Sequence, residues 1–542
     1  MNRTKVIVAL STLLAVAVSA TMFFSCSQYA QRELYDRGQP VACCARSRSQ
    51  AMACCARQRP LLDIQMVETE FNTEAYDHIA ENPFFLVSER PLSTFSIDVD
   101  TASYSNVRRF LNEGQLPPPD AVRIEELVNY FPYDYAPPSD GRPFAVDVAT
   151  AACPWNTDHR LARIALKGRE VPQGERSPAN LVFLLDVSGS MRSDNKLPLV
   201  KQAMKLLVGN LGDEDRIAIA VYAGASGLVL ESTPCSRRQG ILQALDGLEA
   251  GGSTNGGEGI KLAYSAASAN LIRGGINRVI LCTDGDFNVG ITNQGDLIRL
   301  IQDKARSGVF LSVLGFGMGN LKDSTMEKLA DKGNGNYAYI DTIVEARKVL
   351  GEQMGGTLVT IAKDVKIQVE FNPGRVRAYR LIGYENRLLR KEDFNDDTKD
   401  AGEIGAGHTV TALYELVPYG VQVDAPGVDP LKYQTNPVPT AAADSDEWMT
   451  VKLRYKPPDG SVSSRIELTF ADEGAGFDEA PRDLRFAACV ASFGMILRGS
   501  KYKGSFALDD VIRVAQSAKG PDAHGYRAEF IRLARTAKGL KG

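Results

Sequence analysis

Residues 181–191 read Leu-Val-Phe-Leu-Leu-Asp-Val-Ser-Gly-Ser-Met, an apolar run that ends in one carboxylate and two hydroxyls. A continuous apolar run bounded by a Gly-Ser turn is typical of a strand that is buried on both faces of a parallel sheet. Such sheets bind ligands just beyond the carboxyl ends of their strands. We therefore expect Asp186, Ser188 and Ser190 at a binding site. Their oxygen atoms suit a hard divalent cation.

Two further stretches extend this site. Residues 251–257 form a glycine-rich loop with Thr254 at its centre, and residues 278–285 form a second apolar strand that ends at Asp284. The ordered set Asp-x-Ser-x-Ser, Thr, Asp resembles the metal-ion-dependent adhesion site of von Willebrand factor type A domains. The plain alternative is that the serines cap a helix and that the threonine and Asp284-Gly285 belong to turns.

The resemblance implies how these residues would act. Ser188, Ser190 and Thr254 would bind the metal directly, and Asp186 and Asp284 would act mostly through water. We expect Mg²⁺, with Ca²⁺ and Mn²⁺ as alternatives. A cation held mainly by neutral hydroxyls keeps one open position, which a carboxylate of a partner protein can fill. The expected partner is therefore a protein that supplies an acidic residue.

The order of the expected elements predicts the domains. Residues 178–356 alternate between strands and helices, which predicts a doubly wound, mostly parallel sheet of the von Willebrand factor A, Rossmann-like type. Residues 357–475 alternate as antiparallel strands do, and residues 81–177 contain strands together with helices. We predict that these flanks pair into one β-rich domain with the α/β domain inserted in it. Residues 476–542 are expected to form a helical C-terminal region.

The N-terminus predicts export. Residues 1–25 have a basic start, an apolar core and small residues near the end, and Cys26 follows directly. This pattern resembles a bacterial lipoprotein signal, in which Cys26 would carry the lipid, and residues 26–80 would form a tether. An uncleaved membrane helix and an ordinary secretory signal are the alternatives. Each of the three predicts a location in the cell envelope or outside the cell.

Residues from about 80 to 540 resemble a bacterial family of type A domain lipoproteins, with a family-specific N-terminal region and a C-terminal domain of unknown function. Four of its nine cysteines form a Cys-Cys repeat at 43–44 and 54–55, for which we expect a local disulfide or a duplicated tether sequence rather than a metal site. Two other cysteines, Cys282 and Cys489, lie in apolar runs and are expected to be buried thiols.

Composition narrows the function classes. The formal net charge is −4, and no basic block is present, which argues against binding of nucleic acid. The chain has only four histidines and lacks the H-E-x-x-H, G-x-S-x-G and Walker patterns. We therefore predict a binding protein and not an enzyme, acting in adhesion or as an assembly factor for an envelope complex. A metal-dependent hydrolase that uses the same ion is the alternative.

Overall fold

The structure is a computed structural model that describes residues 74–252, 256–285, 294–319, 321–399, 401–425, 429, 432–433, 438–458 and 460–542. These residues belong to one compact unit that begins at Glu70. The expected export signal, Cys26, the Cys-Cys repeat and Thr254 lie outside the described residues. Within them, no helix combines the length and the apolar character that a membrane crossing requires.

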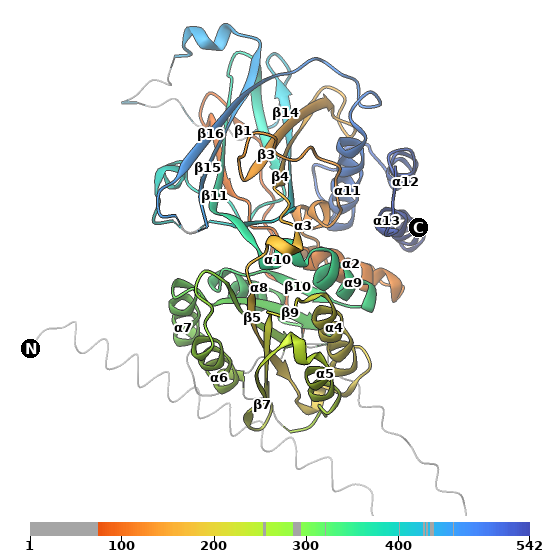
Figure 1. Cartoon of the computed structure of the whole chain (residues 1–542). Coiled ribbons are helices and arrows are strands. Elements are labelled where there is room, and N and C mark those ends of the chain that lie inside the picture. The colour runs from red at the N-terminus through yellow and green to blue at the C-terminus, as the bar shows by residue number, and fades with distance from the viewer. Residues whose placement is uncertain are drawn as a thin grey trace, which may run out of the picture. The chain divides into compact units, whose positions relative to one another are not determined.

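A six-stranded sheet forms the centre of the α/β domain (Figure 1). Its strands, in spatial order, are β10 (Tyr337–Ile340), β9 (Phe310–Phe316), β8 (Ile276–Thr283), β5 (Ala179–Asp186), β6 (Arg216–Tyr222) and β7 (Ser226–Pro234). Neighbours are parallel except β7, which pairs with β6 in the antiparallel direction. All eight residues of β5 are buried, which is why its sequence is apolar without alternation.

Helices cover both faces of this sheet (Figure 1). One face carries α4 (Leu197–Asn210), α5 (Arg238–Asp246) and α9 (Ile343–Arg347). The other face carries α6 (Gly256–Ala269), α7 (Gln294–Arg306) and α8 (Asp323–Lys332). The predicted doubly wound sheet is confirmed. After α9 the chain forms a π-helix at Lys348–Glu352 before α10 (Met354–Leu358).

The flanking segments form two antiparallel sheets whose facing side chains make one core. The first sheet consists of β1 (Phe85–Leu86), β12 (Val376–Ile382), β14 (Thr409–Pro418), β4 (Arg160–Gly168) and β3 (Phe144–Ala152). The second consists of β13 (Ile404–Gly405), β11 (Thr360–Phe371), β15 (Glu447–Lys456), β16 (Ser464–Ala471) and β2 (Leu92–Ser96).

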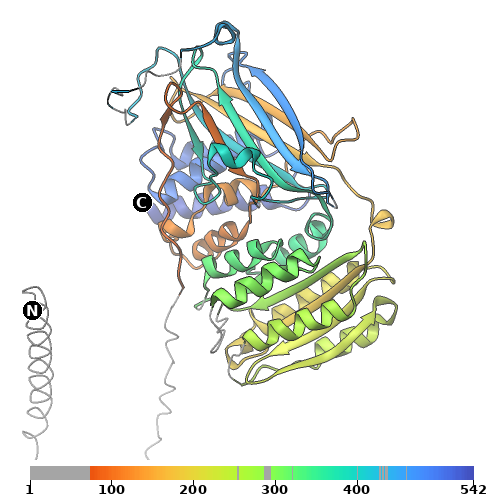
Figure 2. The same ribbon diagram turned by 90° about the vertical axis from the view of Figure 1, so that its left-hand side faces the viewer.

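Strands from both sides of the α/β domain pair directly in this β-rich domain. β4 pairs with β14, and β2 pairs with β11, although each pair is separated by the whole α/β domain in the sequence. Figure 2 shows the orange N-terminal strands beside the blue-green strands that follow the insertion. The predicted insertion of the α/β domain into a β-rich domain is therefore confirmed.

Three helices end the chain, as expected: α11 (Arg482–Arg498), α12 (Leu508–Ser517) and α13 (Tyr526–Lys541). They share a core with α2 (Ala102–Asn112) and α3 (Ile124–Asn129) from the N-terminal flank. Residues 487–497 of α11 are buried. Cys282 and Cys489 are buried free thiols, as predicted. The helical C-terminal region therefore completes the fold begun before the α/β domain.

Candidate metal centre

The carboxyl ends of β5 and β8 bring the two predicted aspartates to one edge of the sheet. The two strands are parallel neighbours, with Leu185 paired to Cys282. Asp186 is the next residue of β5, and Asp284 directly follows the end of β8 at Thr283. Both carboxylates are fully buried. The charge of Asp284 contributes to the raised pKa of Asp186, so the two groups interact.

The loop after β5 brings the two serines beside Asp186. The amide of Ser188 donates a hydrogen bond to Asp186 Oδ1 at 2.8 Å, and the hydroxyls of Ser188 and Ser190 lie 3.0 Å apart. Ser188 precedes a 3-10 helix at Gly189–Arg192, but its side chain makes no capping hydrogen bond. The N-cap of the following helix α4 is Lys196. Simple helix capping therefore does not account for the two hydroxyls.

Backbone hydrogen bonds hold the glycine-rich loop against the first loop. The amide of Gly251 donates to the carbonyl of Val187 at 2.7 Å, and the amide of Gly189 donates to the carbonyl of Gly252 at 3.0 Å. Gly252 has φ = +85°, a conformation that favours glycine. The described part of this loop ends at Gly252, so the role of Thr254 stays a prediction.

One carboxylate oxygen at this edge lacks a hydrogen bond of normal geometry among the described residues. Asp186 Oδ2 is buried and accepts no hydrogen bond of normal geometry within the described part of the chain, although the nearby hydroxyl of Tyr222 favours the charged form of Asp186. Burial raises the pKa of Asp186 to about 6, against the effect of the hydrogen bonds from Ser188. A buried oxygen of this kind is costly unless a donor or a cation satisfies it. The residues present therefore fit a divalent cation.

The donor set consists mostly of hydroxyls. In the described ranges, no three His, Cys, Asp or Glu side chains gather into a metal-ligating group. A cation at this edge would therefore depend on serine and threonine oxygens, which suit Mg²⁺ better than they suit Zn²⁺.

The structure adds one charged residue that the sequence analysis missed. Lys196 Nζ donates a hydrogen bond to Asp284 Oδ2 at 3.0 Å, and both side chains are buried. The available signal was weak: a lysine directly before the apolar stripe of α4. Lys196 neutralises one of the two carboxylates of the site.

The histidines lie elsewhere. His78 pairs with Asp120, His159 with Glu415 and His524 with Glu352, and His408 lines two separate cavities. The hydrolase alternative therefore has no histidine base among these ligands.

Comparison with known proteins gives the family. The model "von Willebrand factor type A domain" matches residues 180–351, "von Willebrand factor" matches residues 70–163, and "Uncharacterized protein YfbK, C-terminal" matches residues 356–540. YfbK of Escherichia coli K12 is 46% identical over 475 residues, which cover 86% of this chain and 82% of YfbK. The chain belongs to the YfbK family of von Willebrand factor type A domain proteins. The predicted family is thus confirmed.

Other matches are more distant. Protein sll0103 of Synechocystis is 28% identical over 190 residues, which cover 35% of this YfbK-family chain and 44% of sll0103. The solved structure "von Willebrand factor type A from Catenulispora acidiphila" aligns with a TM-score of 0.41 at 16% identity, covering 75% of this chain and 91% of that one.

Proposed function

We propose that this YfbK-family protein binds an acidic protein partner through a divalent cation at the edge formed by β5 and β8. Type A domains are generally protein-interaction domains, and that coarser assignment follows from the family. The single observation that supports the metal-dependent form is the meeting of Asp186, Ser188, Ser190 and Asp284 at one edge, where Asp186 Oδ2 makes no hydrogen bond of normal geometry to a described residue.

Each residue has a defined task in this proposal. Ser188, Ser190 and Thr254 would hold the ion through their hydroxyls. Asp186 and Asp284 would interact with it mostly through water. When bound, a divalent cation such as Mg²⁺ supplies a positive centre that accepts a carboxylate from outside the protein. The hydrogen bond from the Ser188 amide fixes the orientation of the Asp186 carboxylate.

Lys196 increases the attraction for an acidic partner. Two aspartates contribute two negative charges, and the buried Lys196 cancels one of them through Asp284. A bound divalent cation would therefore keep a net positive charge of about one at a partly dry edge, where electrostatic attraction is stronger than in bulk water. Such a centre favours a carboxylate over a neutral ligand. Binding, not catalysis, is the function that we propose.

Partner capture tests this proposal. The full-length chain is immobilised and exposed to envelope extract with Mg²⁺ or with EDTA. Asp186→Ala removes a site carboxylate, and Asp194→Ala removes an exposed carboxylate from the same loop as a matched control. With Mg²⁺, we expect the wild type and D194A to retain a partner and D186A to lose it. With EDTA, we expect the wild type to lose the partner as well. Retention in EDTA would refute metal bridging. A partner from the same envelope would indicate complex assembly, and one from another cell would indicate adhesion.

We also propose that Cys26 carries a lipid that anchors the protein in the cell envelope. The basic, apolar and small-residue order of residues 1–25 supports this proposal. Cys26→Ser should abolish labelling by a radioactive fatty acid and release the protein from the membrane fraction. Cys43→Ser, a change outside the signal, should leave both unchanged. Membrane association that persists in C26S without labelling would favour an uncleaved membrane helix instead.

A further inference from the structure

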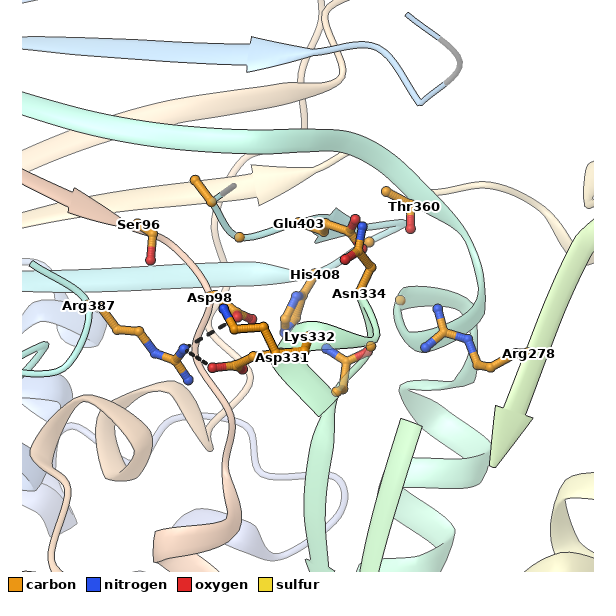
Figure 3. A pocket seen from close by; sticks show the side chains of 16 residues that line it. Ser96, Asp98, Arg278, Asp331, Lys332, Asn334, Thr360, Arg387, Glu403 and His408 are labelled. Carbon is orange, nitrogen blue, oxygen red and sulfur yellow. Dashed lines mark hydrogen bonds and ion pairs between the residues drawn. The ribbon is translucent and has the colours of Figure 1, made fainter. Parts of the chain in front are cut away.

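A cavity lies at the end of β8 opposite to the candidate metal centre, where the α/β domain meets the β-rich domain. It has a volume of about 120 Å³ and a predominantly polar lining. Figure 3 shows Arg278 entering from one side and Arg387 from the other, with Lys332, Asn334 and His408 between them. This volume accommodates a small polyatomic ion together with water, because a cavity of about 10–15 Å³ already holds one water molecule.

Among the described residues, no carboxylate forms an ion pair with the buried Arg278. Its side chain is 1% exposed, and no Asp or Glu oxygen in the described ranges lies within ion-pair distance of its guanidinium. Nη1 donates a hydrogen bond to Ser312 Oγ at 2.6 Å, whereas Nε is buried and has no acceptor. Burial lowers the pKa of Arg278 to about 10, opposed by the more distant charge of Glu403. A buried guanidinium in this state is costly unless an anion joins it.

Arg387 provides the contrast within the same cavity. It is also buried, but it makes ion pairs with Asp331 at 2.9 Å, Glu327 at 2.8 Å and Asp98 at 3.4 Å. Asp98 and Asp331 line the cavity, and both already form ion pairs with Arg387. Two of the three described carboxylates that line the cavity therefore satisfy the other arginine.

Three kinds of neutral or positive side chain in the lining favour an anion, and one carboxylate opposes it. Lys332 is exposed, and Asn334 and Asn336 also line the cavity. Burial, with the charges of Lys167 and Lys348, lowers the pKa of His408 to about 4, so its imidazole is neutral at pH 7 and can donate one hydrogen bond. Glu403 is the one lining carboxylate that Arg387 does not engage, and it limits the net positive charge of the site.

We propose that this cavity binds a small oxyanion, with the Arg278 guanidinium as its charged ligand. Phosphate and carboxylate share the required chemistry, because both offer paired oxygens to a guanidinium fork. Arg278 precedes Asp284 by six residues, a distance of about 20 Å along an extended strand. The oxyanion therefore does not touch the candidate metal centre, and this proposal stands independently of the proposed function.

Thermal unfolding and calorimetry of the full-length chain test the proposal. The protein is titrated with inorganic phosphate, sulfate or acetate in chloride buffer at constant ionic strength. We expect the melting temperature of the wild type to rise with at least one of them, and the three ions separate tetrahedral oxyanions from carboxylates. Arg278→Met should lose this rise, whereas Arg273→Met, which removes an exposed arginine nearby, should keep it.

The outcomes are decisive in both directions. Because Arg278 has no ion-pair partner among the described residues, R278M should melt no lower than the wild type in anion-free buffer. Arg278→Lys, which keeps the charge but loses the planar fork, should weaken anion binding by about tenfold or more. This variant replaces R278M as the test if R278M does not fold. A wild type that responds to none of the three ions up to millimolar concentrations would overturn the proposal. An equal response in R278M or R278K would also overturn it.

Discussion

Lys196 Nζ lies 3.0 Å from Asp284 Oδ2, and this ion pair is buried directly at the candidate metal centre. The lysine thus neutralises a carboxylate that the family resemblance assigns to metal support. A buried pair of this kind contributes little net stability as a unit, but breaking it leaves an isolated charge. The pair therefore couples the charge of the site to the stability of the fold.

Lys196→Met should make the stability of the protein depend on metal. In EDTA, the loss of the lysine charge beside the buried Asp284 should lower the free energy of unfolding by about 3 kcal/mol. Mg²⁺ should restore most of this loss, so the metal-induced rise in melting temperature should exceed that of the wild type. Lys205→Met, which removes an exposed pair with Asp246, is the control and should change stability by less than about 1 kcal/mol. Equal melting temperatures of K196M and wild type in EDTA would contradict this prediction.

Gly317 provides the space that Lys196 occupies. A Cβ atom at this position would collide with the aliphatic stem of Lys196, and Gly317 also has φ = +73°. Gly317→Ala should therefore be more destabilising than Gly274→Ala, which has φ = +69° but no neighbour within 4 Å. Both variants carry the backbone cost of about 1 kcal/mol, and only G317A must displace the lysine. Chemical denaturation of the two variants measures the difference; equal losses would show that Lys196 moves aside freely.

A buried ion network joins the α/β domain to the helices of its neighbours. Arg108 of α2 contacts Asp341 and donates hydrogen bonds to Glu345 of α9 at 2.8 Å and to Glu529 of α13 at 3.1 Å. Arg108→Met should lower the free energy of unfolding by about 3–5 kcal/mol, because it leaves buried carboxylates unpaired. Arg513→Met removes an exposed pair with Asp510 and should cost less than about 0.5 kcal/mol. Similar midpoints in urea for R108M and R513M would contradict this assignment.

His408 should make the protein sensitive to mild acid. Burial, followed by the charges of Lys167 and Lys348, lowers the pKa of His408 from 6.5 to about 4. The unfolded state then binds more protons than the folded state between these two values. The contribution of His408 to stability is thus complete above pH 6.5 and is lost as the pH falls toward 4.

Melting curves between pH 4 and 7 in buffer without oxyanions check this dependence. His408→Gln should flatten the fall in melting temperature below pH 6.5, whereas His78→Gln, at an exposed position, should not. If H408Q keeps the full acid dependence of the wild type, the titrating group is another residue.

The sequence predicted the parts of the fold that leave a local pattern. β5 and β8 are buried on both faces, so their apolar runs reveal both the strands and the edge where Asp186 and Asp284 meet. The change to alternating residues after the α/β domain revealed the insertion. Lys196 was missed because its partner lies 88 residues away and no periodicity connects them. The cavity at Arg278 was missed for the same reason, since its lining comes from distant segments of the chain.

The proposed function depends most directly on whether the full-length protein binds a divalent cation through the residues after β5. Calorimetric titration of the metal-free protein with Mg²⁺ measures this binding. A second titration with Mn²⁺, monitored by electron paramagnetic resonance, measures it independently. The account predicts one saturable site in the wild type and in D194A, and its loss in D186A. A wild type that binds no divalent cation, or D186A that binds it as tightly as D194A does, would contradict the account.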